Sequence, residues 1–418
     1  MLADQVLTAL LARYERPVPR YTSYPTALHW HSLSYQSAQE ACEKSAEASP
    51  VALYVHIPFC DRLCLYCGCH TFVTHRESRL EAYVDTVLKE ARLWRSLLGS
   101  RQCLQLHLGG GTPTHLSVVL LQKLTHELLE IFPPTEAAEL AVEIDPVVTS
   151  TQHLRVLSDA GFSRLSVGVQ DFDSAVQACI QRFQTFEQTE SLIAAARAMG
   201  IASLNIDLMY GLPLQTPRHL ENSARRTVQL QADRVAVFGY AHVPWLKPLQ
   251  KRLETYGLPN RLARLQMFYA AEGVFNEQHY EPIGLDHFAR SSDALAKAAK
   301  QKQLKRNFQG YTVLPSADLI GLGASAISEV AGWYLQNPKE IRGYTHAINT
   351  EQLAVACGHF CTPEDKLRKA VIHELMCHNE ILFKSFESRF GIEFKTDFET
   401  ELLKLKPFEE DGLVKLDR

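Results

Sequence analysis

Residues 51–69 read VALYVHIPFCDRLCLYCGC, an apolar run that leads directly into four closely spaced cysteines. The apolar part, residues 51–57, predicts a buried strand. Cys60, Cys64, Cys67 and Cys69 follow the pattern CxxxCxxC with a further CxC, so their thiolates can converge on one soft metal centre. Three thiolates suit a 4Fe–4S cluster that keeps one iron open to bind a small molecule and pass it an electron. We therefore expect a catalytic metal site in this loop.

Two other uses of the cysteines remain open. A structural zinc site usually takes two CxxC pairs well separated in sequence, and Cys357 with Cys361 is the only other close pair. A disulfide framework is not expected in a chain of 418 residues without an export signal. A zinc protein would be colourless, whereas an iron–sulfur protein would be brown.

Composition restricts the class of protein. Lys and Arg together number 43 against 47 for Asp and Glu, and this balance argues against a general nucleic-acid or membrane-surface binder. No apolar run approaches the roughly 20 residues of a membrane span. The amino-terminal sequence MLADQ lacks the pattern of an export signal, so we expect a cytoplasmic protein in a reducing compartment.

A strand–helix rhythm fills residues 51 to about 241. It predicts six strands, with helical spacing of apolar residues between them, as in Leu80, Val84, Val87, Leu88, Ala91 and Leu98. Such units form a parallel α/β sheet covered by helices and closed fully or partly into a barrel. The predicted strands are Leu53–Ile57, Leu104–Leu108, Leu140–Ile144, Leu165–Val169, Ser203–Leu208 and Val235–Tyr240.

Polar or glycine-rich residues follow each predicted strand, and in such barrels the catalytic groups lie at the carboxyl ends of the strands. The run Gly109-Gly110-Gly111 would let a ligand approach the backbone and use its N–H groups. It lacks the GxGxxG pattern and a P-loop lysine, which disfavours nucleoside triphosphate binding. Turn residues alone would explain about half of these signals.

The rest of the chain divides by pattern. A helix is expected at about 3–14 and an extended segment over 17–26, so residues 1–50 form an amino-terminal extension. Residues 51–350 hold the barrel and its extension, in which 284–290 and 307–312 read as loops. Residues 363–405 read as mainly helical, and we place a mostly helical carboxyl-terminal domain at 351–418.

Several motifs carry a family resemblance from about residue 14 to the end. HIPFCDRLCLYCGC, LHLGGGTPT, VEIDP, LSVGVQDF, NIDLMYGLP and NFQGYT, with PRYTSYPTA near the start, resemble the oxygen-independent coproporphyrinogen III oxidases, which are radical S-adenosylmethionine enzymes. The resemblance implies a partial (β/α)6 TIM-like radical SAM barrel. It also implies a cytoplasmic monomer that receives electrons from a donor such as flavodoxin or ferredoxin.

The same resemblance implies the reaction and its cofactors. Cys60, Cys64 and Cys67 would hold the 4Fe–4S cluster, whose open iron binds the first of two S-adenosylmethionine molecules. Reductive cleavage yields a 5′-deoxyadenosyl radical that removes hydrogen from a propionate of coproporphyrinogen III. Loss of carbon dioxide leaves a vinyl group, and two such steps give protoporphyrinogen IX in heme biosynthesis. A cofactor must supply this chemistry because side chains cannot.

By motif match, Tyr54 and His56 are expected in catalytic roles. Contacts to the first S-adenosylmethionine are expected from Tyr54, Gly110, Glu143 and Ile327. Contacts to the second are expected from Tyr66, Gly111, Thr112, Gln170, Arg182, Asp207 and Ala241. From composition alone, Tyr54 and Ile327 could equally be core residues, His56 a satisfied core histidine and Arg182 a surface charge.

The substrate's propionates need cations, for which Arg20, Arg290, Lys305 and Arg306 are candidates. Cys69 matches the fourth cysteine of the family but is not expected to bind the cluster, and it could equally be a free buried thiol. Members of the family usually continue beyond a segment like residues 411–417, so the carboxyl-terminal domain is expected to be short. The alternative is a related subfamily of heme chaperones, which bind heme without oxidising coproporphyrinogen. Those proteins lack the PRYTSYPT start, have phenylalanine at the position of Cys69, and carry an HNxxYW-like motif where this chain has residues 334–338.

Overall fold

The computed structural model describes residues 4–16, 18, 21, 23–45, 49–315 and 317–416. At its centre lie six parallel strands that pair in chain order. Each contains most or all of one of the six predicted strands, which confirms those predictions. The strands are β2 (Val51–Ile57), β5 (Cys103–Gly110), β6 (Pro134–Ile144), β7 (Arg164–Gln170), β8 (Ser203–Tyr210) and β9 (Arg234–Gly239).

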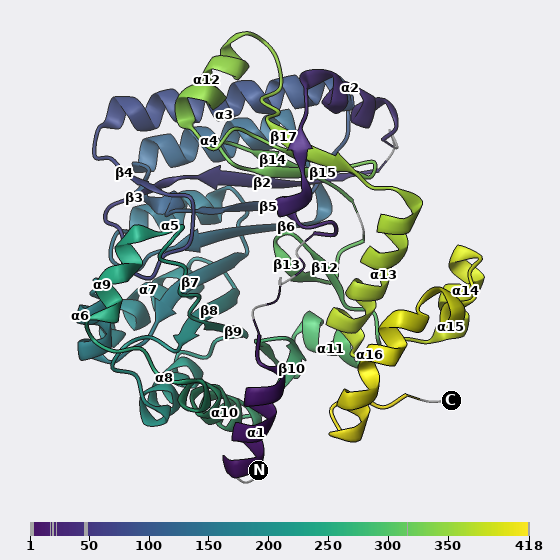
Figure 1. Ribbon diagram of the computed structural model, residues 1–418. Coiled ribbons are helices and arrows are strands. Elements are labelled where there is room, and N and C mark those ends of the chain that lie inside the picture. The colour runs from purple at the N-terminus through teal and green to yellow at the C-terminus, as the bar shows by residue number, and fades with distance from the viewer. Residues whose placement is uncertain are drawn as a thin grey trace.

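Helices connect these strands and cover one face of the curved sheet (Figure 1). The six apolar residues that predicted the first of them are all buried in α3, because their spacing places them on the face toward the strands. The connecting helices are α3 (Glu77–Leu98), α4 (Val118–Ile131), α5 (Thr151–Asp159), α6 (Ser174–Ile180), α7 (Phe186–Ala198) and α8 (Pro217–Gln229).

Further strands extend the sheet at both ends. β14 (Asp318–Leu322) pairs in parallel with β2, and antiparallel β15 (Ile327–Val330), β16 (Trp333–Gln336), β17 (Cys357–Phe360) and β1 (His31–Ser32) follow outward. At the other end, β11 (His287–Arg290) and β10 (Tyr280–Gly284) continue from β9. In the described part of the chain β1 and β10 are the two edges, so the α/β barrel is partial.

The expectation of loops at 284–290 and 307–312 is wrong. Phe288 and Ala289 are buried and pair with β9, so the first run completes a hairpin that extends the sheet. The second run forms another hairpin, β12 (Lys305–Asn307) with β13 (Gly310–Thr312). Both runs contain polar residues, so their composition indicated loops. They form strands because pairing with neighbouring strands outweighs local composition.

The remaining helices lie around this core, and none of the helices described is long and apolar enough to span a membrane. The predictions of helices near residues 3–14 and within 363–405 are confirmed. They are α1 (Asp4–Tyr14), α2 (Tyr35–Glu43), α9 (Lys251–Glu254), α10 (Arg261–Glu277), α11 (Ala294–Lys300), α12 (Ile341–Asn349), α13 (Pro363–His378), α14 (Phe383–Phe390), α15 (Phe394–Asp397) and α16 (Glu399–Glu410), with 3-10 turns at Ala27–His29, Pro113–His115 and Pro248–Gln250.

The first and last helices meet. Arg13 of α1 forms an ion pair of 2.8 Å with Asp411, and the Tyr14 hydroxyl donates to the carbonyl of Pro407 at 3.0 Å. Helices α13 to α16 share a small apolar cluster of their own, built on Leu367, Phe386, Phe394 and Phe398. Figure 1 shows these helices beside the side of the curved sheet that the connecting helices leave open.

Candidate active site

A cavity of about 330 Å³ opens at the carboxyl ends of the parallel strands, and we call it the cysteine cavity. The structure brings most of the predicted site residues together there, from segments far apart in sequence. Those that line it are Cys60, Cys64, Tyr66, Cys67, Gly110, Gly111, Thr112, Glu143, Gln170, Arg182, Asp207 and Ala241.

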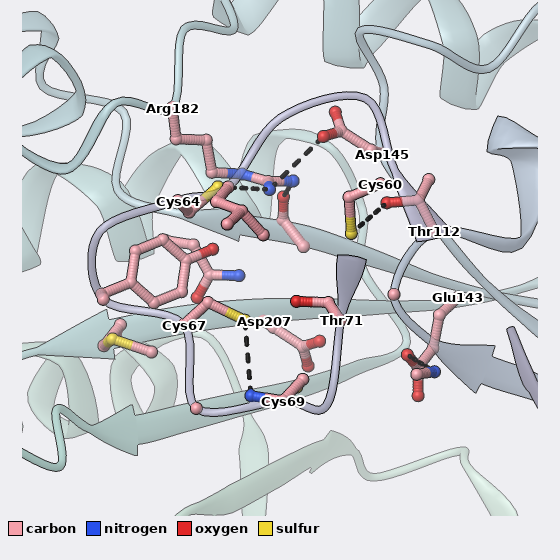
Figure 2. Close-up of a pocket in the computed structure, with 18 of the residues that line it drawn as sticks. Cys60, Cys64, Cys67, Cys69, Thr71, Thr112, Glu143, Asp145, Arg182 and Asp207 are labelled. Carbon is pink, nitrogen blue, oxygen red and sulfur yellow. Dashed lines mark hydrogen bonds and ion pairs between the residues drawn. The ribbon is translucent and has the colours of Figure 1, made fainter. Parts of the chain in front are cut away.

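The cysteine loop is held in place at its base and in its middle. A two-stranded pair, β3 (Phe59–Cys60) with β4 (Phe72–Val73), closes its base. The N–H of Leu65 donates to the carbonyl of Ile180 at 3.0 Å, which fixes its middle. Figure 2 shows the cysteines on this loop, with hydrogen bonds from Arg182 and Thr112 reaching two of the sulfurs.

Each predicted cluster ligand receives a hydrogen bond to sulfur. The Thr112 hydroxyl donates to Cys60 Sγ at 3.7 Å, Arg182 Nη1 donates to Cys64 Sγ at 3.8 Å, and the Cys69 N–H donates to Cys67 Sγ at 3.4 Å. Donors aimed at sulfur stabilise thiolates and tune the potential of an iron–sulfur cluster.

The thiols need a positive group to ionise. Burial raises the pKa of Cys60 to about 12 and also raises that of Cys64, whereas hydrogen bonds from Cys69 lower the pKa of Cys67. In the residues described, no three Cys, His, Asp or Glu side chains lie close enough to hold a single metal ion. A cubane cluster binds each cysteine through a different iron, so its ligands need not converge on one point. The donor set thus fits a 4Fe–4S cluster better than a zinc ion.

Arg182 is a central cation of the cavity. Its side chain is nine-tenths buried, it lies 3.4 Å from Asp145 Oδ2, and its Nη2 donates to the Gly168 carbonyl. Its Nε is buried and has no hydrogen-bond partner among the described residues. A buried guanidinium with an unused donor is suited to bind an anionic group of a ligand.

Glu143 lies at the end of β6 and is held by two donors. The Gly110 N–H donates to Oε2 at 3.0 Å, and His107 Nε2 lies 3.1 Å from Oε1. Burial acts to raise the pKa of this carboxyl, but the hydrogen bonds from His107 and Gly110 outweigh it and lower the pKa below its ordinary value. Glu143 is therefore an ionised acceptor at neutral pH.

The triple glycine lets the backbone pack closely against its neighbours. A Cβ atom at Gly110 would lie 2.4 Å from His56 Nδ1, and one at Gly111 would lie 2.6 Å from the Phe59 carbonyl oxygen. The N–H of Gly110 donates to Glu143 and that of Gly111 to Ile57. Both N–H groups are therefore already hydrogen-bonded within the protein, and the expected contacts of Gly110 and Gly111 with a ligand stay predictions.

Asp207 and Gln170 face the cavity from the next two strands. Asp207 accepts hydrogen bonds from Asn205 Nδ2 at 2.8 Å and from the Ser166 hydroxyl at 3.3 Å, while burial raises its pKa to about 6. Gln170 has a φ of +71° and a buried Oε1 without a partner among the described residues. A strained backbone and an unpaired buried acceptor are both typical of a ligand site.

Three predicted residues lie outside the cavity lining. Tyr54 and His56 are in β2, where the Tyr54 hydroxyl lies 3.1 Å from His56 Nδ1 and His56 Nε2 lies 2.9 Å from the His70 carbonyl oxygen. The carbonyl needs a donor, so Nε2 carries the proton and Nδ1 accepts from Tyr54. Ile327 begins β15, next to Gly321 of β14. Tyr54 and His56 lie against Gly109 and Gly110, and the expected roles of all three residues stay predictions.

Two residues that hydrogen-bond to the cysteine loop, Lys247 and Gln250, have no clear signal in the sequence. Lys247 Nζ donates to the Cys69 carbonyl at 2.6 Å, and Gln250 Nε2 donates to the carbonyls of Tyr66 and Ala241 at 3.0 and 3.2 Å. Nothing in the sequence marks these residues beyond their position soon after the sixth strand. Cys69 is exposed, which argues against the alternative that it is a buried core thiol.

The cations expected for the propionates lie elsewhere. Arg290 Nε donates to the Ala232 carbonyl at 3.0 Å, at the amino end of β9 and far from the cysteines along the sheet. Lys305 and Arg306 line a second cavity. Arg20 lies outside the described residues.

Sequence and structure comparisons agree on the relatives of this chain. Residues 54–227 match the radical SAM superfamily, and residues 361–418 match the HemN C-terminal domain. Oxygen-independent coproporphyrinogen III oxidase of Pseudomonas aeruginosa is 39% identical over 98% of the chain and 90% of its own length, and that of Escherichia coli is 38% identical over 98% and 90%. The chain belongs to the family of oxygen-independent coproporphyrinogen III oxidases.

A solved structure of the family agrees. Coproporphyrinogen III oxidase (HemN) from Escherichia coli, described as a radical SAM enzyme, has 37% sequence identity and a TM-score of 0.93, covering 98% of this chain and 93% of that chain. The radical SAM barrel and helical carboxyl-terminal region are thereby confirmed. As a radical SAM protein, the chain uses a 4Fe–4S cluster and S-adenosylmethionine.

Proposed function

We propose that this protein decarboxylates two propionates of coproporphyrinogen III to vinyl groups without oxygen, giving protoporphyrinogen IX for heme synthesis. The observation that carries the proposal is the cysteine cavity, where three cysteines of the CxxxCxxC motif lie with Arg182, Glu143 and Asp207. The relatives that bear the enzyme's name match almost the whole chain.

Cys60, Cys64 and Cys67 are the proposed cluster ligands. When bound, the cluster and S-adenosylmethionine supply the electron transfer and the radical that removes hydrogen from the propionate. The loop keeps the three sulfurs in one cavity, and its hydrogen-bond donors adjust their charge. With ligands bound, the cavity walls would limit the access of water, which would otherwise compete with the substrate for a reactive species.

Further residues of the cavity are proposed to bind two S-adenosylmethionine molecules. The ionised Glu143 is suited to accept hydrogen bonds from an ammonium group or a ribose hydroxyl of the first molecule. Tyr54, Gly110 and Ile327 are the other proposed contacts of that molecule. Arg182 is suited to bind a carboxylate. It would act with the remaining predicted contacts to the second molecule, Tyr66, Gly111, Thr112, Gln170, Asp207 and Ala241.

His56 is proposed to position the catalytic Tyr54. Burial lowers the pKa of His56, so its ring is neutral at pH 7 and keeps the tautomer that accepts from the Tyr54 hydroxyl. Tyr54 also stacks on His107, whose ring holds Glu143. These contacts therefore form a continuous row of side chains that starts at His56 and ends at Glu143, a proposed contact of S-adenosylmethionine.

The electron donor, assembly and location are also proposals. A flavodoxin- or ferredoxin-type donor would approach the cysteine loop near Trp245 and Leu246. These two exposed residues precede Lys247, which donates a hydrogen bond to the Cys69 carbonyl. The protein would act as a cytoplasmic monomer, where reducing conditions preserve a cluster with an open iron. Units at 1–50, 51–350 and 351–418 would form the extension, the barrel and the helical cover.

Anaerobic incubation with coproporphyrinogen III, S-adenosylmethionine and a reductant tests the function. We expect carbon dioxide and the divinyl product in a two-to-one ratio. Stoichiometric binding of heme, with no carbon dioxide released, would instead identify a heme chaperone.

A further inference from the structure

A second cavity, of about 610 Å³, lies at the opposite end of the same strands. Its lining includes Ala52 at the start of β2, Gln105 near the start of β5 and Leu319 in β14. Gly110, at the far end of β5, lines the cysteine cavity. Five residues of strand separate Gln105 from Gly110, which is about 17 Å at roughly 3.3 Å per residue. The two cavities are therefore separate sites.

The second cavity, here called the lysine cavity, carries an excess of positive charge. Two acidic side chains, Glu329 and Glu374, also line it. The excess is four positive charges, in a chain whose formal net charge is −4. Its cations are Lys302, Lys305, Arg306, Lys366, Lys369 and Arg389.

Part of this charge has no carboxylate partner in the part of the chain that the structure describes. Lys369 pairs with Glu329, and Lys302 pairs with Glu380. Among the residues described, Lys305 has no carboxylate partner, while Lys366 and Arg389 contact only the rings of Phe360 and Phe390. Uncompensated cations that gather around one cavity attract an anion.

A buried histidine provides a second observation. The side chain of His378 is nine-tenths buried and lines the lysine cavity. Its Nδ1 lies 2.9 Å from Glu374, while its buried Nε2 has no hydrogen-bond partner among the described residues. An unpaired buried nitrogen is unfavourable unless a ligand or water satisfies it.

The cavity also has an apolar wall. Leu304, Leu314 and Leu319 line it with Phe390, from the β12–β13 region, β14 and α14. α13 packs against β12, beside which it lies in Figure 1, and its residues line another side of the cavity. A small inorganic anion has no use for such a wall, whereas a ligand with an apolar body and carboxylates at its edge matches both parts.

We propose that the lysine cavity binds an amphipathic polycarboxylate, a tetrapyrrole with its propionates toward Lys305, Lys366 and Arg389. The choice of a tetrapyrrole rests on the proposed function. A molecule held here lies too far from the cysteine cavity to react. It is thus a second, non-reacting tetrapyrrole site at the other end of the parallel strands.

The test uses coproporphyrin III, a stable fluorescent tetracarboxylate, and the anaerobically reconstituted full chain. Lys305→Glu/Lys366→Glu should weaken binding at least tenfold, measured by fluorescence anisotropy, and Lys305→Gln/Lys366→Gln should weaken it less. Lys297→Glu, an exposed site on α11 that does not line the cavity, is the matched control and should bind as the parent does. Since neither lysine has a carboxylate partner, these changes break no ion pair, and circular dichroism checks the fold.

Three outcomes would overturn the proposal. One is unchanged affinity in both double variants, and another is loss of binding only in Gln170→Ala, which would place the porphyrin in the cysteine cavity. The third is citrate binding as tightly as coproporphyrin III, which would make the apolar wall irrelevant. Absence of vinyl product with lysine-dependent binding intact would count against the proposed function alone.

Discussion

Arg182 Nη1 lies 3.8 Å from Cys64 Sγ and donates a hydrogen bond to it. The same atom lies 3.4 Å from Asp145 Oδ2. Burial alone would lower the pKa of Arg182, but the nearby Tyr66 and Asp145 raise it above its ordinary value. A permanent positive charge therefore stands beside one proposed ligand of the cluster, where it favours the reduced state.

Replacing this arginine should change the cluster's redox behaviour. In Arg182→Met, iron content should persist because the three cysteines remain, while the reduction potential becomes more negative and S-adenosylmethionine cleavage falls by about 10- to 100-fold. Redox titration followed by electron paramagnetic resonance measures the first effect. Arg182→Lys retains a charge, so its reduction potential should lie between that of the parent and that of Arg182→Met. A potential equal to that of the parent in Arg182→Met would contradict this role.

The cysteines should differ in their importance. Cys64→Ala removes one of three proposed ligands and should abolish both the brown colour and S-adenosylmethionine cleavage. Cys69→Ala is the matched control, since alanine keeps the backbone N–H that donates to Cys67 Sγ and removes only the thiol of Cys69, which is not a proposed ligand. Iron and sulfide analysis with visible absorption gives the readout. Full iron and full cleavage in Cys64→Ala would refute the ligand assignment.

Much of this site follows from the sequence. The strands β2 and β5 are apolar runs followed by polar residues, so their positions and the rim of the sheet were predictable. Ile327, Lys247 and Gln250 are different, because their place depends on how β15 and the segment after β9 fold back on the barrel. The hydrogen bond from the Gly110 N–H to Glu143 also depends on a neighbouring strand, which sequence spacing does not reveal.

Two polar residues should affect S-adenosylmethionine use without affecting iron. Gln170→Ala and Asp207→Ala should each raise the KM for S-adenosylmethionine by about tenfold, roughly the 1–1.5 kcal/mol of one hydrogen bond. Within the described part of the chain neither side chain hydrogen-bonds to a cysteine, so iron content should stay at the level of the parent. Loss of the cluster in either variant would reassign that residue to a structural role.

Gly110 should not tolerate a side chain. Gly110→Ala would place Cβ against the His56 ring, at a φ of +108° that alanine rarely adopts, and should cost about 2 kcal/mol or more. The matched control is Gly68→Ala, also in the site, where no atom lies within 4 Å of an added Cβ. Thermal unfolding should show a lower midpoint for Gly110→Ala alone. Equal midpoints for the two variants would exclude the predicted clash.

Glu90, buried in α3, should make stability depend on pH. It accepts hydrogen bonds of 2.7 Å from the Gly323 N–H, from Asn337 and from Tyr344, yet burial raises its pKa to about 7. The folded state therefore holds a proton that the unfolded state loses above its ordinary pKa, so stability falls as pH rises from about 4.5 to 7.

Glu90→Gln cannot ionise and lacks this dependence. The stability of the parent relative to this variant should fall by up to about 3 kcal/mol across that interval. Urea unfolding at several pH values measures the difference, and parallel curves for the two proteins would exclude the effect.

The pairing of strands that lie far apart in sequence also limits how much of the sheet can form while the chain is being synthesised. His31 of β1 lies opposite Gly358 of β17, and Val51 of β2 lies opposite Asp318 of β14. At about 5–20 residues per second, translation needs on the order of half a minute between the two members of each pair. Nascent chains must therefore keep their earliest segments unpaired on the ribosome, where a chaperone can reach them, until the final hundred residues emerge.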